Sequence, residues 1–123
     1  MTDATAPRSV LILANPKARG YAPRKIEAVR AALVHHAIAV EVAQSFSRGD
    51  IETIVATRGA DFDVIAVHGG DGTINEAVAG LRMIEGAAPA LAIIAGGTAN
   101  VLAIETRAGR DAIGVEDDTE VSQ

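Results

Sequence analysis

A glycine-rich segment contains the residue types with the clearest chemical meaning in this chain. It reads Val67-His68-Gly69-Gly70-Asp71-Gly72-Thr73-Ile74-Asn75-Glu76, and three of the four positions from 69 to 72 are glycine. Glycines let the backbone turn tightly and present several N–H groups to an anion, and a helix that starts there adds the positive end of its dipole. The segment is therefore typical of a phosphate-holding loop, and we expect a nucleotide as its ligand.

The polar residues of this loop allow more than one interpretation. Asp71 can hold Mg²⁺ or its associated water, orient a nucleotide hydroxyl, or fix the loop through hydrogen bonds. A simple turn would not need three glycines with an acid between them, which favours a ligand role for Asp71. Thr73 and Glu76 have the Ser/Thr-x-x-Glu spacing of a capping box, in which each side chain satisfies a free N–H at a helix start.

Two further turns have a similar character. They read Asn15-Pro16-Lys17-Ala18-Arg19-Gly20 and Ala95-Gly96-Gly97-Thr98-Ala99-Asn100. Thr98 can donate its hydroxyl to phosphate and Asn15 can bond a base or ribose, although Asn15-Pro16 is equally well explained as an ordinary turn. The Gly-Lys-Ser/Thr of a Walker A loop is absent, and no strand is followed by the dinucleotide fingerprint Gly-x-Gly-x-x-Gly.

The elements that position these turns alternate along the chain. Short apolar runs predict strands at residues 9–14, 38–43, 63–67 and 90–95, whereas apolar residues three and four apart predict helices at 24–37, 50–58 and 73–84. The Gly-Gly-Thr turn after residue 95 predicts a further helix. We expect a three-layer α/β/α domain, Rossmann-like, with a mainly parallel sheet and ligands at the carboxyl ends of its strands.

Length and charge restrict the function classes. The chain of 123 residues suits one domain, which we place at residues 9–106, after a flexible N-terminus at 1–8 and before an acidic, disordered tail at 107–123. A net charge of −5 argues against a nucleic-acid partner, and the absence of cysteine favours a cytoplasmic setting. With neither a signal peptide nor a membrane span in the sequence, we expect membrane contact to be peripheral at most.

The sequence resembles the diacylglycerol kinase catalytic domain family, which includes bacterial lipid kinases and sphingosine kinases. The resemblance rests on three ordered motifs: Asn15-Pro16-x-x-x-Gly20, Gly69-Gly70-Asp71-Gly72-Thr73-x-Asn75-Glu76 and Gly97-Thr98-Ala99-Asn100. NAD kinases and phosphofructokinases share the Gly-Gly-Asp-Gly core, so an NAD kinase-like enzyme is an alternative. The Gly-Thr-Ala-Asn turn fits the lipid kinases better.

The resemblance implies an ATP-binding half that helps transfer the γ-phosphoryl group to a diacylglycerol-like lipid hydroxyl, with ATP and Mg²⁺ as cofactors. It assigns nucleotide contacts to residues 69–75 and to Thr98 beside Gly97, while Ser45 matches the position of an ATP-contacting threonine. Asp71 is then the candidate metal ligand. His68 stands where a small or apolar residue is more usual, and we interpret it as a histidine at a strand end rather than a catalytic one.

The larger departure from the family is length. Family members continue into a β-rich, sandwich-like domain that carries the lipid site, the Mg²⁺-binding residues and the general base, and nothing here after Ala103 resembles it. We therefore expect a nucleotide-binding half that lacks a catalytic residue of its own and needs the missing domain to meet lipid. A stand-alone nucleotide-binding or regulatory module, or a truncated remnant, is the alternative. An uncovered domain surface would also promote self-association.

Overall fold

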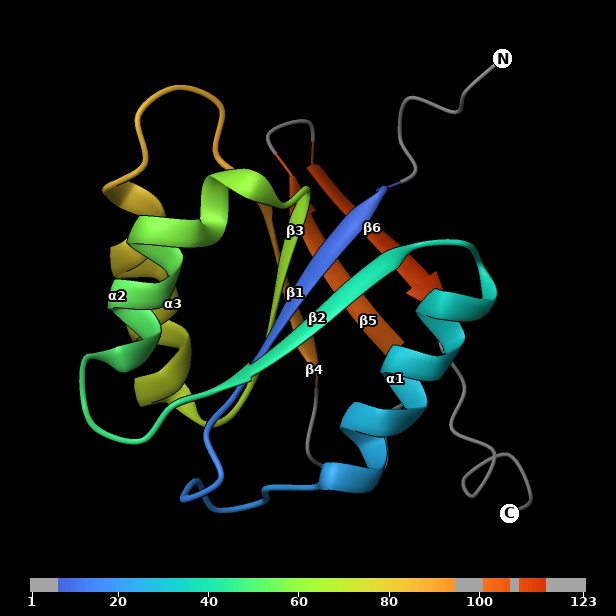
Figure 1. The fold of residues 1–123 in the computed structure, drawn as a ribbon, viewed down its shortest axis with the longest axis horizontal. Helices are drawn as coiled ribbons and strands as arrows, with labels where there is room; N and C mark the ends of the chain where they lie inside the picture. Colours follow the sequence, from blue (N-terminus) through green and yellow to red (C-terminus); the bar gives the residue numbers. More distant parts are fainter. Residues whose placement is uncertain (1–6, 95–100, 107–108, 115–123) are drawn as a thin grey trace.

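The computed structural model describes residues 7–94, 101–106 and 109–114, in which strands and helices alternate up to the fourth strand (Figure 1). The strands are β1 (Ser9–Ala14), β2 (Ala39–Gln44), β3 (Val64–His68), β4 (Ala90–Ile94), β5 (Val101–Thr106) and β6 (Gly109–Gly114). The helices are α1 (Pro23–His35), α2 (Asp50–Arg58) and α3 (Asp71–Arg82), and a 3-10 turn at Gly59–Asp61 precedes β3.

The described residues form one six-stranded sheet in the order β2-β1-β3-β4-β5-β6. Strands β2, β1, β3 and β4 are parallel, whereas β5 and β6 run antiparallel to their neighbours. Strand β2 lies on one side of β1, and the chain then crosses back so that β3 lies on the other side of β1. This reversal creates a topological switch point between β1 and β3, and ligands of open α/β sheets bind beyond the carboxyl ends of the strands at such points.

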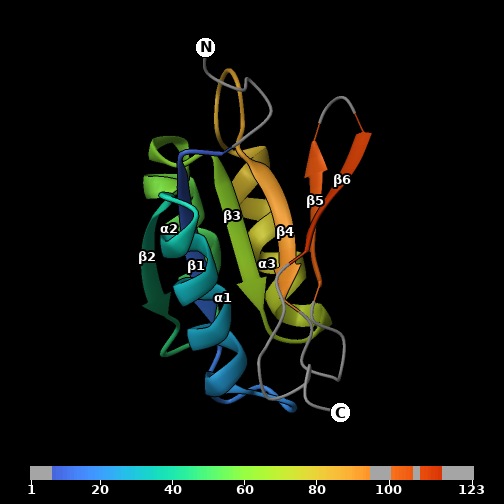
Figure 2. The same ribbon diagram turned by 90° about the vertical axis from the view of Figure 1, so that its right-hand side faces the viewer.

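Helices cover both faces of the sheet, which gives three layers: Figure 1 shows α2 and α3 on one side of the strands and α1 on the other, and Figure 2 shows the strands side by side with α1 in front. Alternate residues of β1 point to opposite faces, as the two-residue period of a strand requires. Val10 and Ile12 pack with Leu33 of α1 in one core cluster, whereas Leu11 and Leu13 pack with Val55 of α2 and Ala77 of α3 in the other. Because both faces are buried, β1 and β3 are apolar almost without interruption, as expected of central parallel strands.

The expected three-layer, mainly parallel α/β fold is confirmed. The first strand and the second helix have the predicted bounds, and the other predicted elements differ at their ends by one or two residues. Local signals were sufficient here: Pro23 occupies the start of α1, where its missing N–H costs nothing, and apolar residues follow at helical spacing.

The segment after β4 differs from the prediction. Residues 101–106 form a strand paired antiparallel with β4, where a helix was expected after the Gly-Gly-Thr turn. The apolar run Val101-Leu102-Ala103-Ile104 suits a strand that covers the edge of β4. Strand β6, at Gly109–Gly114, also falls within the stretch expected to be a tail, and it pairs with β5. Residues 107–108 and 115–123 of that stretch lie outside the described residues.

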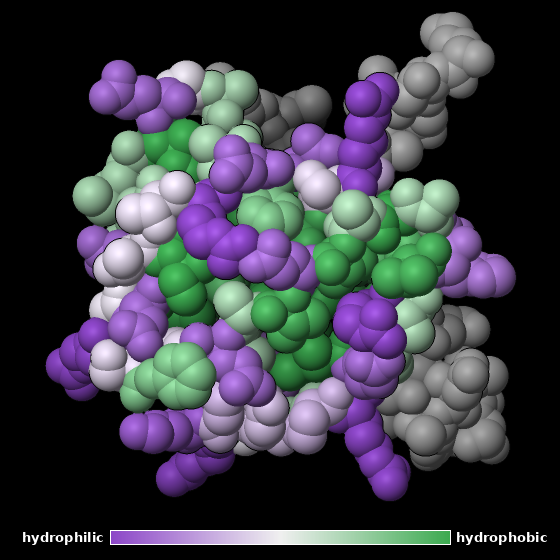
Figure 3. Space-filling view, viewed as in Figure 1, coloured by the Kyte–Doolittle hydropathy of each residue, from purple (hydrophilic) through white to green (hydrophobic). Residues whose placement is uncertain are grey.

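Strand β2 forms the far edge of the sheet and pairs with β1 along its length. Its Val42 side chain is 39% exposed. Figure 3 shows hydrophobic residues gathered near the middle of the face that β2 crosses, with hydrophilic residues around them. In the part of the chain that is described, no helix is long and apolar enough to cross a membrane.

Candidate functional site

Three loops meet at the carboxyl edge of the parallel strands and enclose a pocket. The loops follow β1, β2 and β3, and the pocket has a volume of about 390 Å³, which lies within the usual range of ligand sites. It is lined by Asn15, Lys17, Ala18, Arg19, Ser45, Phe46, Ser47, Arg48, Ile51, Gly70, Gly72, Thr73 and Glu76. The pocket therefore lies where the sheet topology predicts a ligand.

The loop after β3 leads directly into α3. The helix begins at Asp71, with Gly70 as its N-cap, and no side chain caps its first turn. The capping box expected from Thr73 and Glu76 is therefore wrong, because the helix starts two residues before Thr73. The uncapped N–H groups and the positive end of the helix dipole remain available to an anion at this end of the pocket.

Gly69 is required by a close approach between backbone and side chain. A Cβ atom at this position would lie 2.5 Å from Thr73 Oγ1 and 2.7 Å from Thr73 Cβ. Thr73 is itself 6% exposed, so it has little room to move away. Gly69 therefore allows the loop to fold back over the first turn of α3.

The loop after β1 is held by the side chain of Asn15. Asn15 Oδ1 accepts the Lys17 N–H at 3.0 Å, which is an Asx turn, and Asn15 Nδ2 donates to Thr73 Oγ1 at 3.4 Å. The backbone N–H of Asn15 also donates to the His68 carbonyl at 3.2 Å. Asn15 thus lines the pocket while it joins the loop to the start of α3.

The loop after β2 is organised by Asp50 at the start of α2. The Asp50 carboxylate accepts the Phe46 N–H at 2.7 Å, the Ser47 N–H at 2.9 Å and the Ser47 hydroxyl at 3.1 Å. The hydrogen bond from Phe46 and then that from Ser47 lower the pKa of Asp50 from its ordinary value. Ser45, 8% exposed, precedes this turn, and its N–H donates to the Ala14 carbonyl at 2.9 Å.

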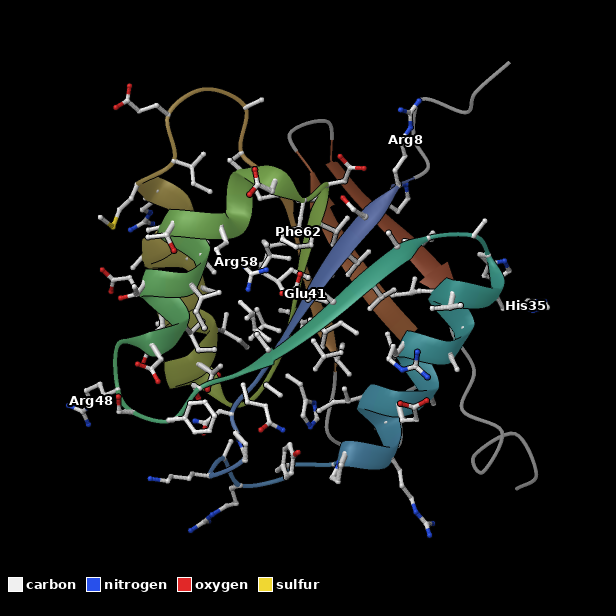
Figure 4. All side chains as sticks on the ribbon, viewed as in Figure 1. Arg8, His35, Glu41, Arg48, Arg58 and Phe62 are labelled. Atoms are coloured by element: carbon white, nitrogen blue, oxygen red, sulfur yellow. The ribbon has the colours of Figure 1, made fainter. Side chains whose placement is uncertain are left out.

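Positive charge gathers at the pocket although the chain as a whole is acidic. Lys17 and Arg19 come from the loop after β1, and Arg48 comes from the loop after β2. All three are exposed at the rim, and Figure 4 shows Arg48 projecting outward from its loop. Glu76 is the one acidic side chain among the described lining residues. The rim therefore suits an anionic ligand.

Phe46 is the largest exposed apolar side chain at the pocket, with 76% of its surface accessible. The predicted site residues did not include Phe46, nor the charged lining residues Lys17, Arg19, Arg48 and Glu76. Lys17 and Arg19 could have been found from the sequence, because they occupy variable positions of the Asn-Pro-x-x-x-Gly segment. The contribution of Glu76 depends on a contact with Gly49, 27 residues away, which no local pattern indicates.

The predicted site residues divide into groups. Those that line the pocket are Asn15, Ser45, Gly70, Gly72 and Thr73. Gly69, Asp71 and Asn75 are not among the lining residues, and the last two are exposed. Ile74 packs against the core cluster on the α2 and α3 face. Gly97 and Thr98 lie outside the described residues.

Asp71 is the one metal ligand predicted from the sequence. Among the described residues, no group of three or more His, Cys, Asp or Glu side chains could hold a metal ion. Mg²⁺ in nucleotide sites is commonly bound by one or two carboxylates together with phosphate oxygens. Asp71, exposed in the first turn of α3, fits that limited role.

A second group of charged residues lies away from the pocket and has a structural role. Arg58 of α2 forms an ion pair with Glu41 of β2, and its guanidinium carbon lies 5.9 Å from the centroid of the Phe62 ring. Figure 4 shows the three side chains together beside β2. They connect α2 to the edge strand.

Comparison with known proteins gives the chain a family. The model of the diacylglycerol kinase catalytic domain matches residues 9–120. A comparison with curated proteins finds no significant match.

Solved structures give the same assignment. One described as a diacylglycerol kinase from Bacillus anthracis str. Sterne is 33% identical, with a TM-score of 0.65 over 78% of this chain and 35% of that one. A second so described is 32% identical, with a TM-score of 0.65 over 81% of this chain and 34% of that one. The chain thus spans about a third of the length of these relatives. Residues 9–120 nevertheless cover nearly all of this sequence, and the chain belongs to the diacylglycerol kinase catalytic domain family.

Proposed function

We propose that this chain is the ATP-binding N-terminal half of a lipid kinase and that its pocket holds the nucleotide. The observation that carries the proposal is the convergence of three strand-end loops on one pocket. The uncapped first turn of α3 forms part of the lining of this pocket. Backbone N–H groups at a helix start bind phosphate without further side chains. Membership of the family supports ATP as the nucleotide.

The charges at the pocket support the placement of the phosphates. Lys17, Arg19 and Arg48 line the same pocket as Gly70, Gly72 and the buried Thr73. These cations and the N–H groups at the start of α3 would together neutralise the charge of a triphosphate. Mg²⁺, bound to the phosphates, would take Asp71 as its protein ligand, and the ion would supply further neutralisation of phosphate charge.

Transfer of the γ-phosphoryl group to a diacylglycerol-like hydroxyl is our proposal for the whole kinase. In that reaction the oxygen of the lipid hydroxyl bonds to the γ-phosphorus, the bond to the β-phosphate oxygen breaks, and a base receives the hydroxyl proton. The chain spans about a third of the related kinases, and we propose that residues beyond it supply the base and the lipid site. A lipid acceptor also implies peripheral contact between a cytoplasmic kinase and the membrane.

Calorimetric titration of the purified chain with Mg·ATP tests this proposal, with Mg·ADP and NAD as comparison ligands. We expect saturable binding of ATP, weaker binding of NAD, and a loss of about tenfold or more in ATP affinity for Asp71→Ala. The matched control is Asp61→Ala, which removes an exposed carboxylate from the 3-10 turn before β3, at the opposite end of that strand from the pocket. A folded protein that binds no nucleotide would reject the proposal and favour a remnant.

A further inference from the structure

His68 joins three segments that surround the pocket. It is the last residue of β3, immediately before the glycine-rich loop, and its side chain is 1% exposed. The backbone N–H of Ala22 donates to His68 Nε2 at 2.9 Å, and His68 Nδ1 lies 3.0 Å from the carbonyl oxygen of Ile94. One buried side chain therefore contacts the end of the loop before α1 and the end of β4.

These two contacts define the protonation state of the ring. Nε2 faces an N–H donor, so it must be an acceptor without a proton. Nδ1 faces a carbonyl oxygen, so it must carry the proton and donate it. Only the neutral tautomer with hydrogen on Nδ1 satisfies both neighbours, and a second proton on Nε2 would face the Ala22 N–H.

The segments that His68 holds are those that carry the site. Ala22 ends the loop that begins at Asn15 and contains Lys17 and Arg19. The His68 carbonyl also accepts the Asn15 N–H at 3.2 Å, so residue 68 contacts both ends of that loop. Ile94 ends β4, on the other side of β3.

We infer that His68 is a positioning residue for the nucleotide pocket: its neutral ring fixes the loop of residues 15–22 against the ends of β3 and β4, and protonation releases it. This inference rests on the proposed function, because it assumes that the pocket binds nucleotide. Protonation would place a positive charge and a second N–H at a buried point that already faces an N–H donor. The hydrogen bond from Ala22 would then be lost. Nucleotide affinity then falls as the pH falls.

Among the described residues, the elements around His68 offer little compensation for that charge. Strands β1 and β4 and the rest of β3 carry no titratable side chain. The loop before α1 brings Tyr21, whose ring centroid is 6.0 Å from that of His68. Asp71, the nearest carboxylate along the chain, is exposed to solvent in α3.

The first experiment is NMR of the chain labelled with ¹⁵N-histidine, without nucleotide. We expect the His68 ring to show hydrogen on Nδ1 at neutral pH, and its protonation on acidification to speed exchange of the Ala22 amide hydrogen. His35→Gln is the matched control, because His35 is exposed at the far end of α1 (Figure 4). Hydrogen on Nε2 at neutral pH, or exchange at Ala22 that ignores His68 protonation, would overturn the inference.

The second experiment measures Mg·ATP affinity from about pH 8 to about pH 5, where histidines in general change charge. His68→Gln offers an amide oxygen to the Ala22 N–H but does not titrate. Because the terminal phosphate of ATP also titrates in this range, the comparison between proteins is the readout. We expect affinity of the native chain and of His35→Gln to fall about tenfold more than that of His68→Gln.

Equal pH profiles for the native chain and a folded His68→Gln would contradict the positioning role. If no protein binds nucleotide at any pH, the proposed function fails, while the ring tautomer and Ala22 exchange still decide the role of His68. If His68→Gln does not fold, the NMR titration of the native chain decides it.

Discussion

The carboxylate of Glu76 accepts a hydrogen bond from the backbone N–H of Gly49, with Oε1 3.1 Å from the nitrogen. Glu76 lies in the second turn of α3, and Gly49 is the N-cap residue of α2, with a left-handed φ of 92°. The bond connects the helix that follows the glycine-rich loop to the loop that follows β2. Two walls of the pocket are therefore held at a set distance by one side chain.

Removing this connection should weaken nucleotide binding. In Glu76→Ala the Gly49 N–H loses its partner and the loop of residues 45–49 gains freedom, so we expect ATP affinity to fall about three- to tenfold. Glu76→Gln keeps an oxygen acceptor and should restore most of the affinity. Calorimetric titration measures both variants, and equal loss in the two would show that charge, not the hydrogen bond, is what matters.

The Asp50 carboxylate should make the loop after β2 sensitive to acid. Hydrogen bonds from Phe46 and Ser47 lower the folded-state pKa of Asp50, so its stabilising contribution is present above its unfolded-state pKa. The contribution disappears as the pH falls through the lowered folded-state pKa. We expect urea unfolding from neutral to acid pH to show a smaller loss of stability for Asp50→Asn than for the native chain. Asp61→Asn serves as a control, and a native-like profile for Asp50→Asn would contradict this account.

Gly80 should be essential for the packing of α2 against α3. A Cβ atom at Gly80 would lie 2.7 Å from the Glu52 carbonyl oxygen and 2.7 Å from Val55 Cβ. Gly80→Ala should therefore lower the free energy of unfolding by about 1–3 kcal/mol, despite the better helix propensity of alanine. Gly72→Ala is the control, because a Cβ atom at Gly72 would have no neighbour within 4 Å among the described residues. Urea denaturation distinguishes the two, and equal stabilities would show that the helices separate at little cost.

Gly69 should affect both stability and binding, because its neighbour is a pocket residue. Gly69→Ala forces Thr73 away from its buried position, which should cost about 1–3 kcal/mol of stability and lower ATP affinity as well. Denaturation and calorimetry measure the two effects separately. A variant with native affinity would show that the position of Thr73 is not important for the ligand.

The exposed edge of β2 should favour self-association. Val42 presents an apolar side chain on a strand that pairs with β1 alone among the described strands. Exposed edge strands of this kind can pair with a strand of another chain, and a lysine on the edge strand opposes such pairing. Sedimentation should show a mass that rises with concentration for the native chain and less so for Val42→Lys. A monomer at every concentration would remove this prediction.

The sequence by itself determined the alternation of strands and helices up to Ile94. Buried strands such as β1 are recognisable because apolar runs depend on local composition, and α1 is recognisable from Pro23 and its helical spacing of apolar residues. The glycine-rich turn also identified the phosphate-binding candidate, because glycine's conformational freedom is a property of the residue. The segment after residue 100 was mistaken for a helix, since its pairing with β4 depends on distant residues.

Only the tertiary structure decided how the loops become a pocket. The order β2-β1-β3 brings the turns after three strands to one edge, and this order is a property of chain crossing rather than of any local pattern. Glu76 and Gly49 are 27 residues apart, and His68 is 46 residues from Ala22 and 26 from Ile94. Their roles follow from contacts that exist only when the sheet has formed, because a hydrogen-bonding side chain has no assigned partner until the fold supplies one.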